Sequence, residues 1–496
     1  MTMPAHTDTH HPHRLQNNVL SAADSIVMAV AGSAPAYSIA ATTATLIAAA
    51  GLASPAALLW CGIPMLGIAW AFSYLGRADI NAGASYSWVG RALHPALGFL
   101  SGWALVVSAT IFMVAGSLPA GSVTVDLFAP THDSSTWLVT LIGSVWFLMM
   151  VTCVLIGIRL TTRAQWIMSS IEVAILILFI VIAFIRAGTG HHAGPSFGWN
   201  WLWFSHFDGT SGFVAAALIA AFYYWGWDVS ANLNEETRDS RKSSGLGGII
   251  GVLIVFSLFE LFTIAINMML SAKTIQAHSG NVLGELGDVI WPGPGGKILI
   301  VAVMLSTIAT LETTLIQVTR SLFAMGRDRT LPARFGRTNP RWRTPAFATL
   351  VVAGVSLILF VGSNFLGSIG TILADAISSI GLQIAFYYAL AGLAVVVAYR
   401  RVIMKSAKNF VFIGLWPLVG AGFMVWIFIE SIPTLGKTVD IIGLGTLAVG
   451  LIPMTIYWIK GSPYFVRRPL DTSATGEPEP EGGDDALVSA VTSRED

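Results

Sequence analysis

Long apolar stretches, each about as long as a membrane is thick, dominate the chain. A helix rises about 1.5 Å per residue, so roughly 20 apolar residues cross a hydrocarbon core about 30 Å thick. Twelve such stretches alternate with short polar segments. They cover residues 24–49, 55–75, 96–121, 137–158, 164–186, 212–233, 247–270, 297–325, 347–363, 372–399, 411–432 and 439–459. The pattern predicts an all-α membrane protein with twelve transmembrane helices.

The basic residues between these stretches predict the orientation. Cytoplasmic loops retain Lys and Arg, whereas translocated loops avoid them. With twelve spans, 23 of the 27 Lys and Arg residues fall on one side of the membrane. The other side receives Arg186, Lys273, Lys297 and Lys437. We therefore expect a multi-pass protein of the inner (cytoplasmic) cell membrane with both termini in the cytoplasm.

The composition agrees with a lipid environment and argues against several other classes of protein. Apolar residues make up 54% of the chain and charged residues 11%, with a mean hydropathy of +0.71. Soluble domains carry about 25% charged residues. The net charge is zero, which gives no reason to expect nucleic acid as a partner. Cys61 and Cys153 lie in apolar stretches without metal or redox spacing, and no HExxH, GxSxG or phosphate-loop motif is present. We expect neither an enzyme nor a bound metal or cofactor.

Two of the predicted spans contain helix breakers near mid-membrane. The first contains Gly32 and Pro35, and the sixth contains Gly226. Proline lacks a backbone N–H, and glycine tolerates non-helical dihedral angles. Interrupted helices five spans apart are typical of inverted-repeat transporters, in which the interruptions form the substrate site. Simple kinks in two packed helices are the alternative interpretation.

The breakers also predict how the chain is divided. The inverted repeats would comprise residues 21–187 and 211–400, each with five helices, followed by two C-terminal helices within residues 410–460. The polar residues 1–20 and the acidic, Pro- and Gly-rich residues 469–496 are predicted to be disordered cytoplasmic tails.

Four short motifs resemble those of a known transporter family. The segments are NAGASYSW at 81–88, GFLSGW at 98–103, NEETRD at 234–239 and RSLFAMGRDRTLP at 320–332. With these motifs the chain resembles the amino acid, polyamine and organocation (APC) transporter superfamily from about residue 20 to 468, and in particular its bacterial amino acid permeases. The resemblance implies alternating access, in which broken helices 1 and 6 enclose the substrate.

The resemblance also implies a set of substrate-binding residues. Backbone N–H groups of the broken first helix would bind the substrate carboxylate, and carbonyl groups of the broken sixth helix would bind the amine. The residues implied are Gly32, Ser33 and Ala34 on the carboxylate side, and Phe222, Trp225, Gly226 and Asp228 on the amine side. Phe222 would cover the bound substrate as a thin gate.

The first helix departs from the family pattern. The family usually has Gly-Ser-Gly followed by an apolar residue, whereas here Ala34 and Pro35 follow Ser33, which removes one N–H donor. A decarboxylated amine such as putrescine is therefore an alternative substrate. The aromatic residues near the second interruption either form a cage for a cation or pack a membrane helix; they are Tyr223, Tyr224, Trp225 and Trp227.

Acidic residues inside the spans are candidates for energy coupling, because a carboxylate at mid-membrane costs roughly 2.5–3.5 kcal/mol. They are Glu172, Asp228, Glu260, Glu312, Asp375 and Glu430. No Lys or Arg lies centrally in a span, so these acids are most easily buried in the neutral, protonated form. This favours proton coupling and leaves sodium coupling as an alternative.

Three of these acids are the preferred coupling residues. Asp228 comes first, because some family members carry an acid there, and it is alternatively a ligand of the substrate ammonium. Glu312 comes second, in a Thr- and Ser-rich part of the eighth helix that faces the first in this fold. Glu172 is third, at a point of the fifth helix where some relatives place a Lys. For Glu260, Asp375 and Glu430, a helix-packing hydrogen bond or an interfacial position is expected.

These observations predict a secondary active transporter of amino acids or related small amines, working as a proton symporter. A polyamine transporter and an amino acid exchanger are the alternatives. The expected partners are the small-molecule substrate, a coupling proton and the lipid bilayer, and no sequence feature indicates an oligomeric state.

Overall fold

A computed structural model describes residues 14–128, 136–278, 281–365, 369–466 and 468–472. This part of the chain is helical, and its only β-like pairing is an isolated bridge between Leu20 and Thr237. Within it, ten helical stretches are long and apolar enough to cross a membrane. The chain is therefore a multi-pass membrane protein.

The long helices coincide with the predicted apolar stretches. They are α5 (Pro95–Phe128), α6 (Thr136–Ile156), α7 (Ile158–Gly188), α10 (Ser240–Met269), α13 (Gly295–Arg327), α14 (Ala346–Ser363) and α15 (Ile369–Ala398). Two further stretches contain a π-helical turn: α16 (Ala407–Asn409), η7 (Phe410–Leu415) and α17 (Trp416–Ser431), then α18 (Lys437–Asp440), η9 (Ile441–Gly445), α19 (Thr446–Val449) and α20 (Leu451–Ile459).

The first and sixth predicted spans differ from the rest. The remaining membrane-length stretch is the first in the chain, Ala22–Ala78, and it covers the first two predicted spans. It contains α1 (Ala22–Ser33), α2 (Pro35–Ala50), η1 (Gly51–Ala53) and α3 (Ser54–Ala78). The predicted span 212–233 is divided into α8 (Gly209–Tyr223) and the single turn α9 (Val229–Asn232). Because α8 alone is shorter than a full span, the number of twelve remains a prediction.

Short helices connect these spans or lie beside them. They are α4 (Ser85–Ala92), η3 (Trp199–Leu202), η4 (Phe204–His206), η5 (Asn234–Glu236), α11 (Ala272–Ala277), α12 (Val282–Ile290), η6 (Ile403–Lys405), η8 (Ile432–Thr434) and η10 (Pro463–Phe465).

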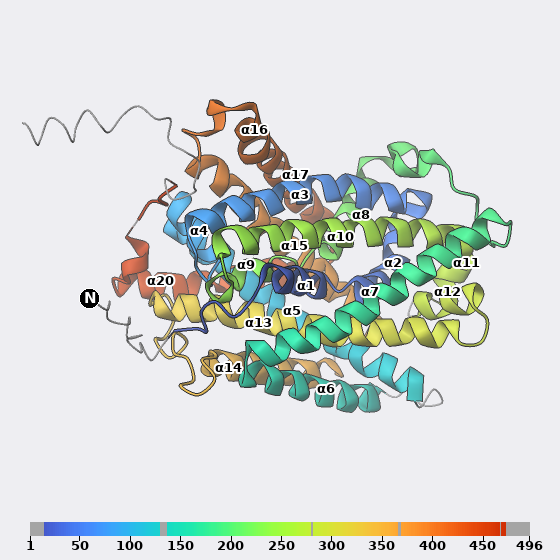
Figure 1. Cartoon of the computed structure of the whole chain (residues 1–496), viewed down its shortest axis with the longest axis horizontal. Helices are drawn as coiled ribbons and strands as arrows, with labels where there is room; N and C mark the ends of the chain where they lie inside the picture. Colours follow the sequence, from blue (N-terminus) through green and yellow to red (C-terminus); the bar gives the residue numbers. More distant parts are fainter. Residues whose placement is uncertain (1–13, 129–135, 279–280, 366–368, 467, 473–496) are drawn as a thin grey trace, which may run out of the picture.

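The helices form one bundle with α1 in its interior. Figure 1 shows the long helices running beside one another along the longest axis, with α1 near the centre and α6 and α14 at one edge. α1 packs against α7, α9, α10 and α13, while α5 packs against α13 and α15. Large aliphatic side chains remain exposed on the outer helices, including Leu141, Val145, Ile167, Ile177, Ile185 and Ile358. This outer surface faces lipid, so the polar chemistry must lie around α1.

Both predicted tails extend beyond the described residues. Residues 1–13 and 473–496 lie outside them, so the prediction of disorder is not addressed there. Within the predicted N-terminal tail, Leu15 and Leu20 are buried, and the Leu20 N–H donates to the Glu236 carbonyl at 3.0 Å. The end of this segment therefore packs on the bundle just before α1 begins.

Candidate functional site

The first interruption lies at Ala34, between α1 and α2. Ala34 has φ 47° and ψ 68°, a left-handed conformation that is unfavourable for a residue with a Cβ. Pro35 follows as the first residue of α2, where its missing N–H does no harm to the new helix. The interruption thus lies between Gly32 and Pro35, the two helix breakers that the sequence predicted in the first span.

The second interruption lies between α8 and α9 and packs directly on the first. Gly226 has φ 97°, which favours glycine. A Cβ on Gly226 would lie 2.2 Å from the Gly32 carbonyl oxygen, and a Cβ on Gly32 would lie 2.2 Å from the Gly226 carbonyl oxygen. Only two glycines permit this approach. The two interruptions therefore meet backbone to backbone in the middle of the bundle.

The residues predicted to bind a carboxylate have their backbone groups engaged within the protein. Gly32 and Ser33 belong to the last turn of α1, and the Ala34 N–H donates to the Val30 carbonyl at 3.1 Å. The Gly32 carbonyl accepts a hydrogen bond from the Thr310 hydroxyl of α13 at 2.9 Å. Their role in substrate binding stays a prediction, because the donors at the start of α2 belong to other residues.

Those donors are the N–H groups of Ala36 and Tyr37, which sequence reasoning missed. The Ala36 N–H donates to Glu172 Oε1 at 2.8 Å, and the Tyr37 N–H donates to Ser306 Oγ at 3.1 Å. The Ser306 hydroxyl donates in turn to the same Glu172 oxygen at 2.6 Å. Glu172 of α7 therefore caps the N-terminus of α2 from another helix. Pro35 was the signal in the sequence, since it marks where a new helix begins.

The predicted amine side contains a chain of hydrogen bonds through aromatic residues. Trp225 Nε1 donates to Tyr387 Oη at 2.7 Å, and the Tyr387 hydroxyl donates to Asp228 Oδ2 at 2.9 Å. The Trp225 ring packs edge-on against the Phe112 ring, with 5.4 Å between their centroids. The centroid of the Phe222 ring lies 6.3 Å from that of Phe112. The structure brings Phe222, Trp225 and Asp228 together beside the interruption.

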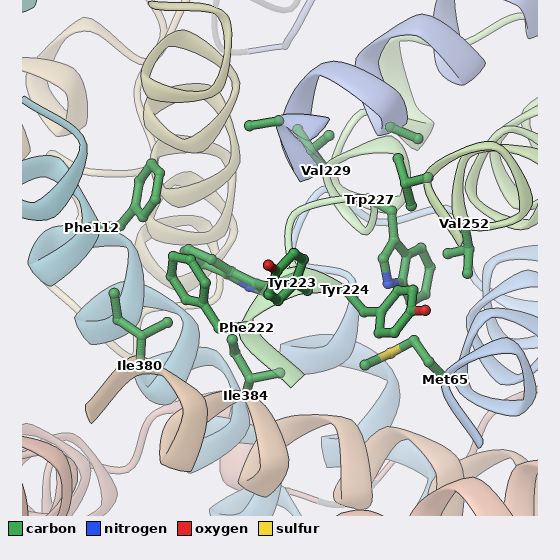
Figure 2. Packing of buried hydrophobic residues seen from close by; sticks show 14 of the residues in the cluster. Met65, Phe112, Phe222, Tyr223, Tyr224, Trp227, Val229, Val252, Ile380 and Ile384 are labelled. Carbon is green, nitrogen blue, oxygen red and sulfur yellow. The ribbon is translucent and has the colours of Figure 1, made fainter. Parts of the chain in front are cut away.

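The other aromatic residues of this segment are packed. Figure 2 shows Phe222, Tyr223, Tyr224 and Trp227 gathered around the interruption, with Phe112 to one side. Tyr223 and Tyr224 both pack on Phe259, with ring centroids 5.0 and 5.7 Å away. These contacts fit the packing interpretation of the aromatic run, and Trp225 is the member hydrogen-bonded towards Asp228.

Asp228 is buried beside several hydrogen-bond donors. It is 1% exposed, and its Oδ2 atom accepts from Tyr387. The buried side chains of Gln317 and Tyr388 also face this carboxylate, and both interact with it as hydrogen-bond donors in addition to Tyr387. A buried carboxylate that several donors but no cation surround is a candidate position for a proton or a ligand.

Glu312, the second predicted coupling residue, faces the fifth-helix region. Its Oε2 atom accepts a hydrogen bond from Gln165 Nε2 of α7 at 2.6 Å, and the same nitrogen donates to the Ala309 carbonyl at 3.0 Å. The neighbouring Thr310 is the residue that reaches α1. Helix α13 thus contacts both elements, but Glu312 itself is hydrogen-bonded to α7.

The three remaining acids, Glu260, Glu430 and Asp375, differ in burial and in hydrogen bonding. Both Glu260 oxygens are buried without a hydrogen-bond partner in the described part of the chain, so the expected packing hydrogen bond is not formed. Glu430 is exposed near the end of α17, which agrees with an interfacial position, and Asp375 is half-buried in α15.

Three of the family-like motifs meet at one end of the bundle. The Ala82 N–H donates to Glu235 Oε1 at 2.8 Å, and Asn232 Nδ2 donates to the Ala82 carbonyl at 2.7 Å. Asn232 also donates to Ser321 Oγ at 3.0 Å. The segments 81–88, 234–239 and 320–332, distant in sequence, therefore form one cluster.

Ion pairs reinforce this cluster. Arg320 donates from Nε and Nη2 to the two oxygens of Glu236, at 2.9 and 3.2 Å, and each side chain is 1% exposed. Arg327 pairs with Glu235 at 2.9 Å nearer the surface. A cavity of about 1340 Å³ opens beside the cluster, lined by residues within 14–18, 80–81, 234–243 and 327–328. Glu235 and Arg327 of the cluster line this cavity.

Comparison with known proteins identifies related transporters. The profile of the family described as "Amino acid permease" matches residues 19–451. The methylthioribose transporter of Bacillus subtilis (strain 168) is 25% identical over 78% of this chain and 83% of its own length. The low-affinity putrescine importer PlaP of Escherichia coli (strain K12) is 22% identical over 80% of this chain and 84% of its own length. The serine/threonine exchanger SteT of B. subtilis (strain 168) is 25% identical over 50% of this chain and 54% of its own.

Proposed function

This chain belongs to the amino acid permease family, and from that membership we propose that it is a proton-coupled symporter for a small amine or amino acid. It would work by alternating access in the cytoplasmic membrane, with twelve spans and both termini in the cytoplasm. Residues 21–187 and 211–400 would form the inverted repeats, with residues 410–460 as the two additional helices.

The observation that carries the proposal is the contact between the two interrupted helices. Gly32 and Gly226 pack against each other, and Asp228 lies buried beside them with no cationic partner among the described residues. Irregular backbone at membrane depth is tolerated only where protein or a cavity satisfies it, and such sites bind substrate in transporters. Phe222 and Trp225 would contact the substrate there.

The cluster of Arg320, Glu236 and Asn232 supports alternating access. In this proposal the cluster would close the route between the interruptions and the open cavity that Glu235 and Arg327 line. Opening towards the cytoplasm would require these contacts to separate, and closing would re-form them. Two discrete packings of the same interface are what a transporter needs in order to expose its site to one side at a time.

Asp228 is the proposed coupling residue, followed by Glu312 and Glu172. Asp228 connects to the aromatic residues of the site through Tyr387, so a proton on its carboxylate changes the hydrogen bonds offered to the substrate. A buried carboxyl group without a cationic partner changes charge when it takes up a proton, and this change would favour one facing state.

The relatives suggest two alternatives for the substrate and the mode. The methylthioribose transporter and the putrescine importer PlaP are named after compounds that have no carboxylate group. SteT is named as an exchanger of the amino acids serine and threonine. A polyamine importer and an amino acid exchanger are accordingly the alternatives to amino acid symport.

Uptake into proteoliposomes tests the proposal. Purified protein is assayed with labelled amino acids and polyamines, with and without an inward pH gradient. Gradient-dependent accumulation is expected for wild type, and Asp228→Asn should lose it while retaining exchange of preloaded substrate. Uptake by wild type that requires internal substrate and ignores the gradient would instead identify an exchanger. Gradient-driven uptake by the variant would exclude Asp228 from coupling.

A further inference from the structure

The N-terminus of α2 already holds a carboxylate that belongs to the protein. Glu172 is fully buried, and its Oε1 atom accepts from the Ala36 N–H and the Ser306 hydroxyl. Ser306 in turn accepts from the Tyr37 N–H. Both donors available at the start of this half-helix are therefore used, one directly and one through a hydroxyl group.

A substrate carboxylate has no free donors at this position. The first N–H groups of a helix are the ones that bind anions. Pro35 supplies none, and Ala36 and Tyr37 serve Glu172 and Ser306. An entering carboxylate would have to displace Glu172 and would then lie close to it. With Glu172 ionised, two like charges at short range in a low dielectric would cost several kcal/mol, and with Glu172 protonated the donors would still be occupied.

The surroundings offer no cation to offset that cost. Arg320 is the one buried Arg or Lys side chain among the described residues, and it is paired with Glu236 in the cluster at the end of the bundle. Near the interruptions the buried charged side chains are acidic, Glu172 from α7 and Asp228 beside α9. The electrostatic environment therefore favours a cation and disfavours an anion.

We propose that Glu172 replaces the carboxylate of the substrate, so that the transported compound is a small organic cation without a carboxylate group. This inference rests on the proposed transport function and narrows its substrate class. Glu172 Oε2 is buried without a hydrogen-bond partner in the described chain, and Asp228 is a buried carboxylate with neutral donors around it, so these two groups are the acceptors proposed for ammonium groups. One flanks each interruption, which suits a compound with two separated amines or one amine and an apolar end.

Matched pairs of compounds test the inference on the unmodified protein. Putrescine and ornithine, cadaverine and lysine, and phenethylamine and phenylalanine each differ only by a carboxylate. Uptake into proteoliposomes, and competition against whichever labelled amine is transported, are measured for all six. Each transported amine is expected to compete at least about ten-fold better than its amino acid, a difference of about 1.4 kcal/mol.

The outcomes separate this inference from the proposed function. Amino acids that are transported as well as their amines would overturn the inference and leave the permease function intact. No transport of any compound, by liposomes that retain their pH gradient, would overturn both. Preferred transport of a neutral compound such as methylthioribose would overturn the requirement for a cation.

Variants of Glu172 provide the second test. Glu172→Ala frees the Ala36 N–H and the Ser306 hydroxyl, so the preference for amine over amino acid should fall at least about ten-fold. Glu430→Gln, which alters an exposed carboxylate, is the matched control and should keep the preference. An unchanged preference in a Glu172→Ala protein that elutes as a single species would contradict the inference. If that variant does not fold, the comparison of amines with their amino acids on the wild-type protein still tests the inference.

Discussion

At the scale of single residues, two adjoining backbone positions decide how the interrupted helices meet. The carbonyl oxygen of each of Gly32 and Gly226 lies 2.2 Å from where a Cβ on the other would be, and Ala34 takes a left-handed conformation. Local strain of this kind costs of order 1–3 kcal/mol and persists only where surrounding packing enforces it. These positions should respond to substitution in ways that ordinary helix residues do not.

Gly226→Ala is expected to abolish transport and lower the thermal unfolding temperature by several degrees. The added Cβ would lie 2.2 Å from the Gly32 carbonyl oxygen, at a φ of 97° that L-residues rarely adopt. Scanning fluorimetry and proteoliposome uptake measure both effects. Gly354→Ala is the control, because nothing lies within 4 Å of a Cβ there and its φ is ordinary. An active Gly226→Ala protein of normal stability would show that the two interruptions do not need this contact.

At Ala34, unlike at Gly226, an exchange between alanine and glycine is expected to be tolerated. Ala34→Gly should retain transport and keep the unfolding free energy within about 1 kcal/mol of wild type, because relief of the left-handed strain offsets the lost methyl group and the added chain entropy. Ala34→Val should lose stability and transport, since a β-branched residue is strongly disfavoured there. Equal behaviour of the two variants in thermal unfolding would argue that the conformation of residue 34 does not matter.

At the scale of elements, sequence patterns predict helices well and their mutual contacts poorly. Apolar runs of about 20 residues located the long helices, and Pro35 and Gly226 located the two interruptions. The capping of α2 by Glu172 involves positions 136 residues apart, and no local pattern encodes which face of α7 meets α2. The resemblance implied substrate-binding N–H groups at 32–34, which stays a prediction, and it did not indicate that the Ala36 and Tyr37 N–H groups at the start of α2 bond to Glu172 and Ser306.

The ion pairs between α13 and η5 differ in burial, and this difference predicts unequal effects. Arg320→Ala should destabilise the protein by about 3–5 kcal/mol, because Glu236 would be left buried and unpaired. Arg327→Ala breaks a pair whose Arg is 36% exposed, and should cost less than about 1 kcal/mol. Thermal unfolding of both variants checks the contrast. Adding Glu236→Ala to Arg320→Ala should recover part of the loss, and a double variant less stable than the single one would contradict this account.

At the scale of the whole molecule, three segments distant in sequence meet at the end of the bundle beside the open cavity. Their resemblance to family motifs was visible in the sequence, but their meeting point required the fold. Asn232 contributes to this contact by donating to both Ala82 and Ser321, and so joins the loop after α3 to helix α13. Contacts made in one facing state and broken in the other set the balance between the two states.

Asn232→Ala should therefore shift the protein towards the state open at this end. A cysteine at Ala231, 5% exposed between the interruption and the cluster, reports the opening when Cys61 and Cys153 are replaced by alanine. Losing two hydrogen bonds of about 1 kcal/mol each would change the equilibrium by roughly ten-fold or more. The expected result is faster labelling of this cysteine by an impermeant thiol reagent applied from the cluster side, with Ser257→Ala on the exposed face of α10 as the control. Labelling that is unchanged by Asn232→Ala, in protein of normal stability, would mean that the cluster holds the fold together without gating the path.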